Sequence, residues 1–187
     1  MRFSWLALGL MGMLWLAGCG DLLSVHPLAT AETTVFDASL TGEWACADKD
    51  CKGTALIRAA SVEKKEYDIV WIPGDADEEA LRLKGKLVKV GERVVFDLVS
   101  TKKQELAVAG HFFMLVEKTS DGVKFHWLDS EWLRNRVAWQ NALAHTMVGD
   151  KPVITAGSAE MNAFLAKAGL DGKAVSDSLA FRRVKGQ

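Results

Sequence analysis

The sequence predicts a mainly β domain, in which an antiparallel meander closes into a barrel or a strongly curved sheet and two helices cover it. Short runs of alternating apolar and polar residues, bounded by turn residues, recur between residues 40 and 129. Beyond Asp129 the apolar residues recur at helical spacing instead. The chain has 187 residues, which is enough for one domain of this kind.

Seven strands are expected in succession, each bounded by Gly, Pro, Asp, Ser or Thr. Because the connections between them are short, neighbouring strands should pair in antiparallel fashion. The expected strands span residues 40–47, 54–60, 66–72, 80–90, 93–99, 110–118 and 123–129.

The strand over 80–90 has the clearest alternation of apolar and charged residues. We expect one face to be buried and the other exposed, with Leu81, Leu83 and Leu87 on the first and Arg82, Lys84 and Lys86 on the second. After Leu87 the apolar residues change face to Val88 and Val90. This change of phase predicts a bulge.

After Asp129 we expect a helix over 130–147, a short strand over 153–156, a second helix over 158–168 and a last strand over 178–184. Arg136 interrupts the apolar side of the first helix, so it should reach a carboxylate or the rim of the domain. Gly169 should end the second helix.

The first nineteen residues have the form of an export signal. Arg2 precedes an apolar run over 3–17, which is shorter than the roughly 20 residues of a spanning helix. The quartet Leu16-Ala17-Gly18-Cys19 resembles the lipobox of bacterial lipoproteins. That resemblance implies a signal peptide over 1–18, cleavage before Cys19 and a diacylglycerol on its thiol. We expect residues 19–39 to form a tether, docked through Phe36 and Leu40, and residues 40–187 to form the domain.

The resemblance to lipoproteins also implies a place in the bacterial cell envelope. Gly20 stands where an Asp would signal retention in the inner membrane, so the outer membrane, on its periplasmic side, is the expected location. The chain carries 23 Lys and Arg and 24 Asp and Glu, and the two signs are interleaved. This balance offers no basic surface for nucleic acid or anionic lipid, so attachment to the membrane should depend on the acyl chains.

Cys46 and Cys51 are the two cysteines that remain beside Cys19. In an oxidising compartment they should form a disulfide across a short turn, because no further Cys or His lies nearby at the spacing of a zinc site. The acidic turn 75–79 does not fit a calcium loop, since Ala80 and Lys86 occupy the positions that need Gly and Glu. We therefore expect no metal and no cofactor.

One pair of residues could take part in acid–base chemistry. Asp97 interrupts the apolar run 94–99, and His111 opens the apolar run 111–116. If the two strands form a hairpin centred near Gln104, Asp97 and His111 face each other. The pair could be a catalytic couple or a structural, charge-assisted contact.

Aromatic residues on the predicted strands either fill the core or line a cavity for an apolar ligand. The candidates for a cavity are Trp44, Trp71, Phe113, Phe125 and Trp127.

The sequence Gly42-Glu43-Trp44, at the start of the first strand, resembles the Gly-x-Trp opening of lipocalins. The wider layout resembles a group of uncharacterised bacterial proteins, many of them lipoproteins, that have a small lipocalin-like sheet. It runs through Phe96-Asp97-Leu98, His111-Phe112-Phe113 and Leu128-Asp129-x-x-Trp132-Leu133. The resemblance implies a fold and brings no activity with it. The helical segments after Asp129 depart from the plain lipocalin pattern.

Three functions are compatible with the sequence. The first is a membrane-anchored envelope lipoprotein that binds a small apolar ligand or a partner protein without catalysis. The second is a hydrolase or transferase that uses Asp97 and His111. The third is a purely structural envelope factor with a filled core. The chain contains no nucleophile elbow, His-Glu-x-x-His, Walker loop or dinucleotide fingerprint, which favours the first and third functions.

The lipid anchor is directly testable. Exchange Cys19→Ser should leave an unprocessed precursor without acyl chains, because the thiol has to be modified before the signal peptide is cleaved. Mass spectrometry of the mature wild-type protein should find a diacylglycerol adduct on Cys19, and an unmodified thiol there would contradict the anchor.

Overall fold

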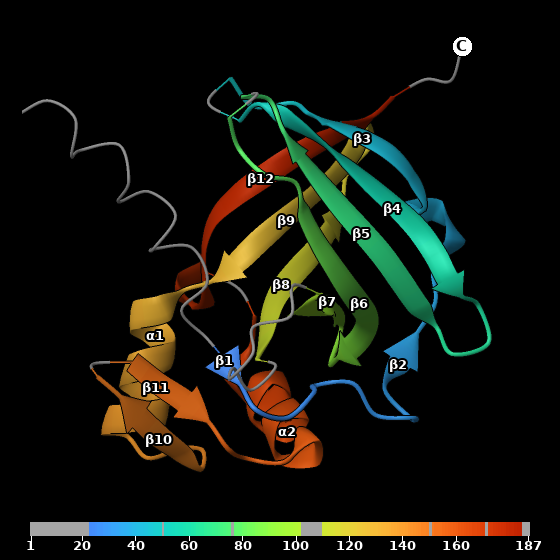
Figure 1. The fold of residues 1–187 in the computed structure, drawn as a ribbon. Helices are drawn as coiled ribbons and strands as arrows, with labels where there is room; N and C mark the ends of the chain where they lie inside the picture. Colours follow the sequence, from blue (N-terminus) through green and yellow to red (C-terminus); the bar gives the residue numbers. More distant parts are fainter. Residues whose placement is uncertain are drawn as a thin grey trace, which may run out of the picture.

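The computed structural model describes residues 23–49, 51–75, 77–101, 110–149, 151–170 and 172–184. Its centre is a closed, antiparallel barrel of eight strands (Figure 1). Cys19, the expected signal peptide and Gln104 lie outside the described residues. Among the described residues, no helix has the length and apolar character needed to cross a membrane.

Seven of the barrel strands follow one another in the chain and pair in order. They are β3 (Gly42–Cys46), β4 (Gly53–Ser61), β5 (Glu66–Pro73), β6 (Leu81–Val90), β7 (Arg93–Ser100), β8 (His111–Lys118) and β9 (Gly122–Leu128). The last strand, β12 (Val175–Arg183), lies between β9 and β3 and closes the barrel. The predicted meander is therefore confirmed, and the seven predicted strands end within two residues of the observed ones.

The barrel interior is filled by one cluster of apolar side chains. Its largest members come from different strands and stack on one another, with Tyr67 edge-on to Phe96 and Phe125 edge-on to Phe181. Gly85 allows this packing, because a Cβ atom there would lie 2.8 Å from a methyl group of Leu98. Around these side chains the barrel interior is filled and packed like a protein core.

A second apolar cluster lies outside the barrel, over β6, β7 and β8. Val95, Phe113 and Leu115 point outward into it, while Phe96 and Met114 point inward into the first cluster. Strands β7 and β8 are thus buried on both faces, which explains their nearly continuous apolar sequences.

The second cluster also corrects two expectations for the 80–90 strand. Pairing between β6 and β7 runs without a shift from Leu83 to Val90, so there is no bulge. Val88 and Val90 are buried because the outer face is covered there, which accounts for the change of phase. Leu83 and Leu87 are buried as expected and Arg82 and Lys84 are exposed, with Lys86 partly so. Leu81 was predicted to be buried but is 42% exposed, because it lies at the first position of the strand, at an end of the barrel.

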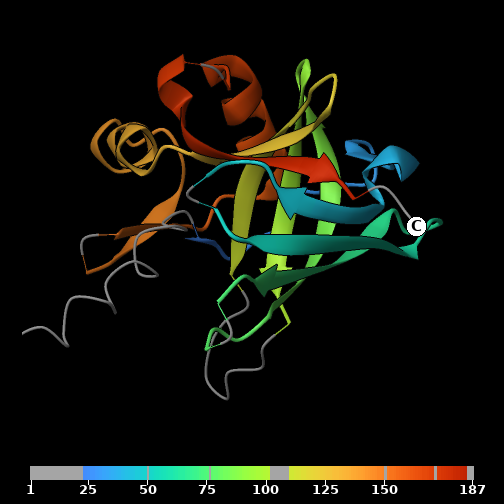
Figure 2. The same cartoon turned by 90° about the horizontal axis from the view of Figure 1, so that it is seen from above.

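The segment between β9 and β12 covers this outer face. It contains α1 (Ser130–Arg134), the π-helical turn η2 (Asn135–Trp139), β10 (His145–Val148), β11 (Lys151–Ile154), α2 (Ser158–Ala168) and η3 (Gly172–Ala174). Figure 2 shows these orange and red segments gathered on one side of the barrel. Helix α2 has the predicted bounds.

The predicted helix over 130–147 is wrong beyond Trp139. Asn141 has a positive φ of 48°, a left-handed conformation that ends a helix, and residues from His145 form a hairpin with β11 instead. Tertiary pairing therefore overrides the helical spacing. Arg136 is exposed at the rim, as expected, and donates to Oε1 of Gln140 at 3.1 Å.

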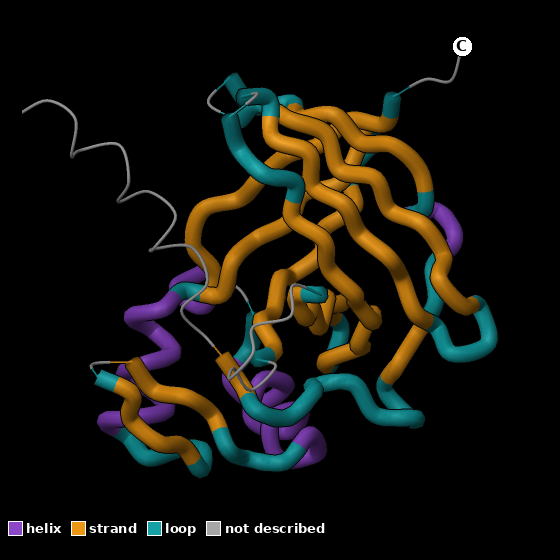
Figure 3. The backbone as a smooth tube through the Cα atoms, viewed as in Figure 1, coloured by secondary structure: helices purple, strands orange, loops and turns teal. Residues whose placement is uncertain are grey.

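The segment that we expected to be a tether is packed from residue 23 onward. It contributes β1 (Leu23–Ser24), β2 (Thr34–Val35) and the 3-10 helix η1 (Ala38–Leu40). Strand β1 pairs in parallel with β11 and antiparallel with the start of β8. Leu28 has no exposed surface, since it lies between the barrel and α2 in the second cluster. The purple η1 stands apart from the other helices in Figure 3.

The sulfur atoms of Cys46 and Cys51 are bonded, with 5.7 Å between the two Cα atoms. This separation lies within the roughly 7 Å that a disulfide allows, as the predicted bridge requires.

Removal of the Leu28 side chain should destabilise the domain strongly. Leu28→Ala would leave a cavity in the second cluster, and we expect the free energy of unfolding to fall by about 2–5 kcal/mol in urea titration. Leu81→Ala is the matched control, with an expected loss below about 1 kcal/mol because that side chain is partly exposed. Equal losses for the two variants would contradict the burial of Leu28.

Candidate functional site

One end of the barrel, which we call the sealed end, is closed by η1. Trp44 lies beneath it and donates from Nε1 to the Leu40 carbonyl at 2.9 Å. The Arg183 guanidinium stacks 4.5 Å from the centre of the Trp44 ring and donates to the carbonyl oxygens of Thr41 and Ser39. Gly42 has a φ of 140°, and a Cβ atom there would clash with this guanidinium. The Gly-x-Trp sequence therefore has a structural role at this end.

Polar contacts hold η1 and its neighbours in place. The Tyr67 hydroxyl accepts from the Asp37 amide at 2.7 Å and donates to the Asp37 carbonyl at 3.2 Å. Burial raises the pKa of Tyr67 above its ordinary value. Partial burial also raises the pKa of Asp37, but hydrogen bonds from Lys118 and Ser39 and the charge of Lys118 outweigh it, so this pKa lies below its ordinary value. The Asp37 carboxylate therefore stabilises the fold at neutral pH, and this stabilisation is lost as the pH falls through the folded-state pKa.

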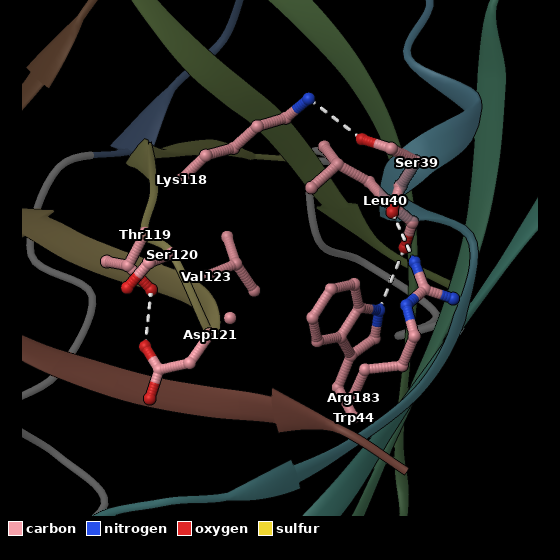
Figure 4. A pocket seen from close by; sticks show the side chains of 10 residues that line it. Ser39, Leu40, Trp44, Lys118, Thr119, Ser120, Asp121, Val123 and Arg183 are labelled. Atoms are coloured by element: carbon pink, nitrogen blue, oxygen red, sulfur yellow. Dashed lines mark hydrogen bonds between the residues drawn. The ribbon is translucent and has the colours of Figure 1, made fainter. Parts of the chain in front are cut away.

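A cleft of about 330 Å³ opens beside this seal, between η1 and the turn that joins β8 to β9 (Figure 4). Lys118 and Arg183 lie on its walls, and both already donate to oxygens of Ser39 in η1. Asp121 accepts from Thr119 at 3.2 Å. Because both cationic side chains of the cleft are engaged in holding η1, we assign the cleft to the closure of the sealed end.

The other end carries partly exposed aromatic side chains that point inward. Trp71, Phe112 and Trp127 pack against the rim of the interior cluster without being fully buried. Phe112 and Trp127 stack with ring centres 6.4 Å apart, and Trp71 meets Phe181 edge-on at 5.8 Å. We call this end, defined by these three side chains, the aromatic end. It is the place where the interior cluster meets solvent.

The predicted cavity residues fall in three places. Trp71 and Trp127 lie at the aromatic end, whereas Trp44 and Phe125 are buried in the filled interior. Phe113 points outward into the second cluster, so it cannot line the interior. Phe112 takes the inward position that we assigned to Phe113. Phe112 is two residues from Met114 in β8, so both side chains point inward. The sequence does not show which residues of β8 point inward, because the strand is apolar on both faces.

Asp97 and His111 are in contact, although the predicted register is shifted by two residues. Asp97 pairs with Phe113 and His111 with Val99, so the two are diagonal neighbours on the outer face. His111 Nδ1 lies 2.7 Å from Oδ1 of Asp97. Because a carboxylate only accepts, Nδ1 carries the shared hydrogen.

Asp97 also holds the N-terminal segment. Its Oδ2 accepts from the backbone amides of Leu28 at 2.8 Å and Ala29 at 3.0 Å. Only 3% of the Asp97 side chain and 20% of the His111 side chain are exposed. Both carboxylate oxygens are therefore used inside the fold, an arrangement that satisfies buried amides and suits a structural pair.

Within the described part of the chain, no three His, Cys, Asp or Glu side chains are grouped in a way that could hold a metal ion. Comparison of the chain with protein-family models, with curated proteins and with solved structures found no match. The similarity to lipocalins and to the bacterial lipoproteins therefore stays a prediction from short motifs.

Loss of the Asp97 carboxylate should destabilise the domain. Asp97→Ala would leave two buried amides and the His111 ring without an acceptor, and we expect a loss of about 3 kcal/mol in the free energy of unfolding. Asp97→Asn should recover most of this loss, because its amide oxygen can accept from the two backbone amides while its NH₂ group donates to Nδ1 of the other His111 tautomer.

Asp121→Ala is the control for this pair of variants, since Asp121 is an exposed carboxylate with a long contact to Arg182. Its unfolding curve should match the wild type within about 0.5 kcal/mol. If Asp97→Ala were as stable as Asp121→Ala, the contact with the N-terminal segment would not contribute to stability.

Proposed function

We propose that this protein is a lipid-anchored envelope lipoprotein that binds a small apolar ligand at the aromatic end of its barrel. The observation that carries the proposal is the inward-facing group of Trp71, Phe112 and Trp127, which is left partly exposed while the opposite end is sealed. Aromatic side chains left partly exposed at one end of a barrel are suited to bind an apolar molecule.

The place of the expected anchor supports the same function. Strand β1 begins at Leu23, four residues after Cys19, and Ser24 pairs with His111, the first residue of β8. The first residues of β8 lie at the aromatic end, and Figure 1 shows β1 on that side of the barrel, away from β2. An acylated Cys19 would therefore bring the aromatic end, not the sealed end, close to the membrane, which is a source of apolar ligands.

The alternatives have less support. The enzyme hypothesis needs a free acid or base, but Asp97 already accepts hydrogen bonds from His111 and from two backbone amides. The purely structural hypothesis explains the filled interior but gives no reason for three partly exposed aromatic side chains at one end. Turnover that is lost in both Asp97→Asn and His111→Ala would favour a hydrolase or transferase.

A titration tests the proposal. Protein that starts at Gly20, and so lacks the lipid, is titrated with a fluorescent fatty acid, which is then displaced with oleate. We expect saturable binding of one ligand per barrel. Trp71→Ala should weaken it by about tenfold, which corresponds to the loss of roughly 1.4 kcal/mol of apolar contact.

Ile72→Ala is the matched control, because Ile72 is the next residue of β5 and is exposed on the outer face. It should bind like the wild type. Absence of saturable binding in the wild type would contradict the proposal and leave a partner-protein or structural role. Equal weakening by both variants would show that the ligand binds elsewhere.

A further inference from the structure

The hairpin formed by β10 and β11 exposes two apolar side chains at its tip. Met147 is 47% exposed and Val148 is 63% exposed, and they pair with Pro152 and Lys151 just before the turn at Gly149. Exposure of two adjacent apolar side chains to water is unfavourable in free energy. Met147 and Val148 end β10, just before Gly149-Asp150 in the sequence, and exposed apolar side chains at such a place point to a contact outside the domain.

The hairpin is attached to the first described residues of the chain. Leu23 pairs with Val153 and Ser24 with Ile154, and the Val25 amide donates to the Ile154 carbonyl at 3.0 Å. On the other side of β11, Val153 pairs with Thr146. Leu23 is thus two strand spacings, about 10 Å, from β10 and the residues of the hairpin tip.

The lipid-bearing residue must lie close to the same place. Leu23 stands four positions after Cys19, and an extended chain of four Cα–Cα steps spans at most about 14 Å. The acyl chains are therefore held within a short distance of the hairpin, so the bilayer that takes up the lipid lies against this side of the domain.

We infer that the tip of the β10–β11 hairpin, Met147 and Val148, inserts into the interfacial region of the bilayer that holds the acyl chains. This inference rests on the lipid anchor of the proposed function. The hairpin would then fix the orientation of the barrel on the membrane as a second contact beside the lipid, because two attachment points prevent free rotation about the tether.

The hairpin lies on the same side of the barrel as the aromatic end. Figure 1 shows β10 and β11 beside β1, which pairs with the start of β8 at that end. The turn between β5 and β6, which carries Asp75, Asp77 and Glu78, follows Trp71 at the aromatic end. Asp150 stands between the two hairpin strands in the sequence. Acidic residues are thus present on this side of the domain, and the inferred contact is confined to Met147 and Val148.

A depth measurement on the full, acylated protein tests the inference. The native cysteines are acylated or in a disulfide, so Val148→Cys provides a single free thiol for a bimane label. The protein is reconstituted in phosphatidylcholine vesicles that contain lipids with a nitroxide near the head of the acyl chain. We expect a blue shift of the label's emission and loss of most of its fluorescence.

Val62→Cys is the matched control. Val62 has nearly the same exposure, 62%, but lies in the turn between β4 and β5 at the sealed end, where Lys65 donates to the Thr34 carbonyl. Its label should be quenched several-fold less than the label at residue 148. Equal quenching at the two positions would overturn the inference.

The outcomes separate this inference from the proposed function. Protein that sediments with vesicles while the label at residue 148 remains unquenched would overturn the insertion and keep the anchor; the tip would then serve a protein partner or a second copy. Protein that does not sediment would overturn both the anchor and the insertion. Ligand binding by the lipid-free protein is measured separately and depends on neither result.

Discussion

The structure depends on the attachment of the N-terminal segment to the barrel by Asp97. The carboxylate accepts from the amides of Leu28 and Ala29, while Asn162 of α2 donates to the Leu28 carbonyl at 2.6 Å. Both backbone groups of Leu28 are therefore satisfied while its side chain is fully buried. Leu28 thus joins β7, α2 and the N-terminal segment, so the position of this segment relative to the barrel is fixed.

The second apolar cluster follows from the same constraint. The outer faces of β6, β7 and β8 are apolar, and they need a cover that the eight strands alone do not provide. The cover comes from both sides of the barrel sequence, from Leu28 before it and from α1 and α2 between its seventh and eighth strands. Strand β12, which closes the barrel, follows the covering segment in the chain. Barrel and cover therefore form one domain.

The alternation in β4, β5 and the first part of β6 was sufficient to predict an antiparallel meander, because one face of these stretches is largely exposed. It was not sufficient for β7 and β8, whose burial on both faces hides which residues point inward, and so Phe113 was assigned in place of Phe112. The contact of Asp97 with His111 was predictable from two polar residues in apolar runs. The role of Asp97 was not, because its other partners are backbone amides 68 and 69 residues away, which leave no sequence pattern.

The two ends of the barrel are unlike, and under the proposed function the N-terminal segment would decide which of them lies near the membrane. Amide hydrogen exchange at Leu28 and Ala29, measured by NMR on the folded domain, tests this claim most directly. If Asp97 holds the segment, both amides should exchange as slowly as the ladder amides of β7, since they open only with the second cluster. Exchange as fast as that of the exposed turn at Gly91 would show that the segment is not held, and the position of the barrel relative to the proposed lipid anchor would then be undefined.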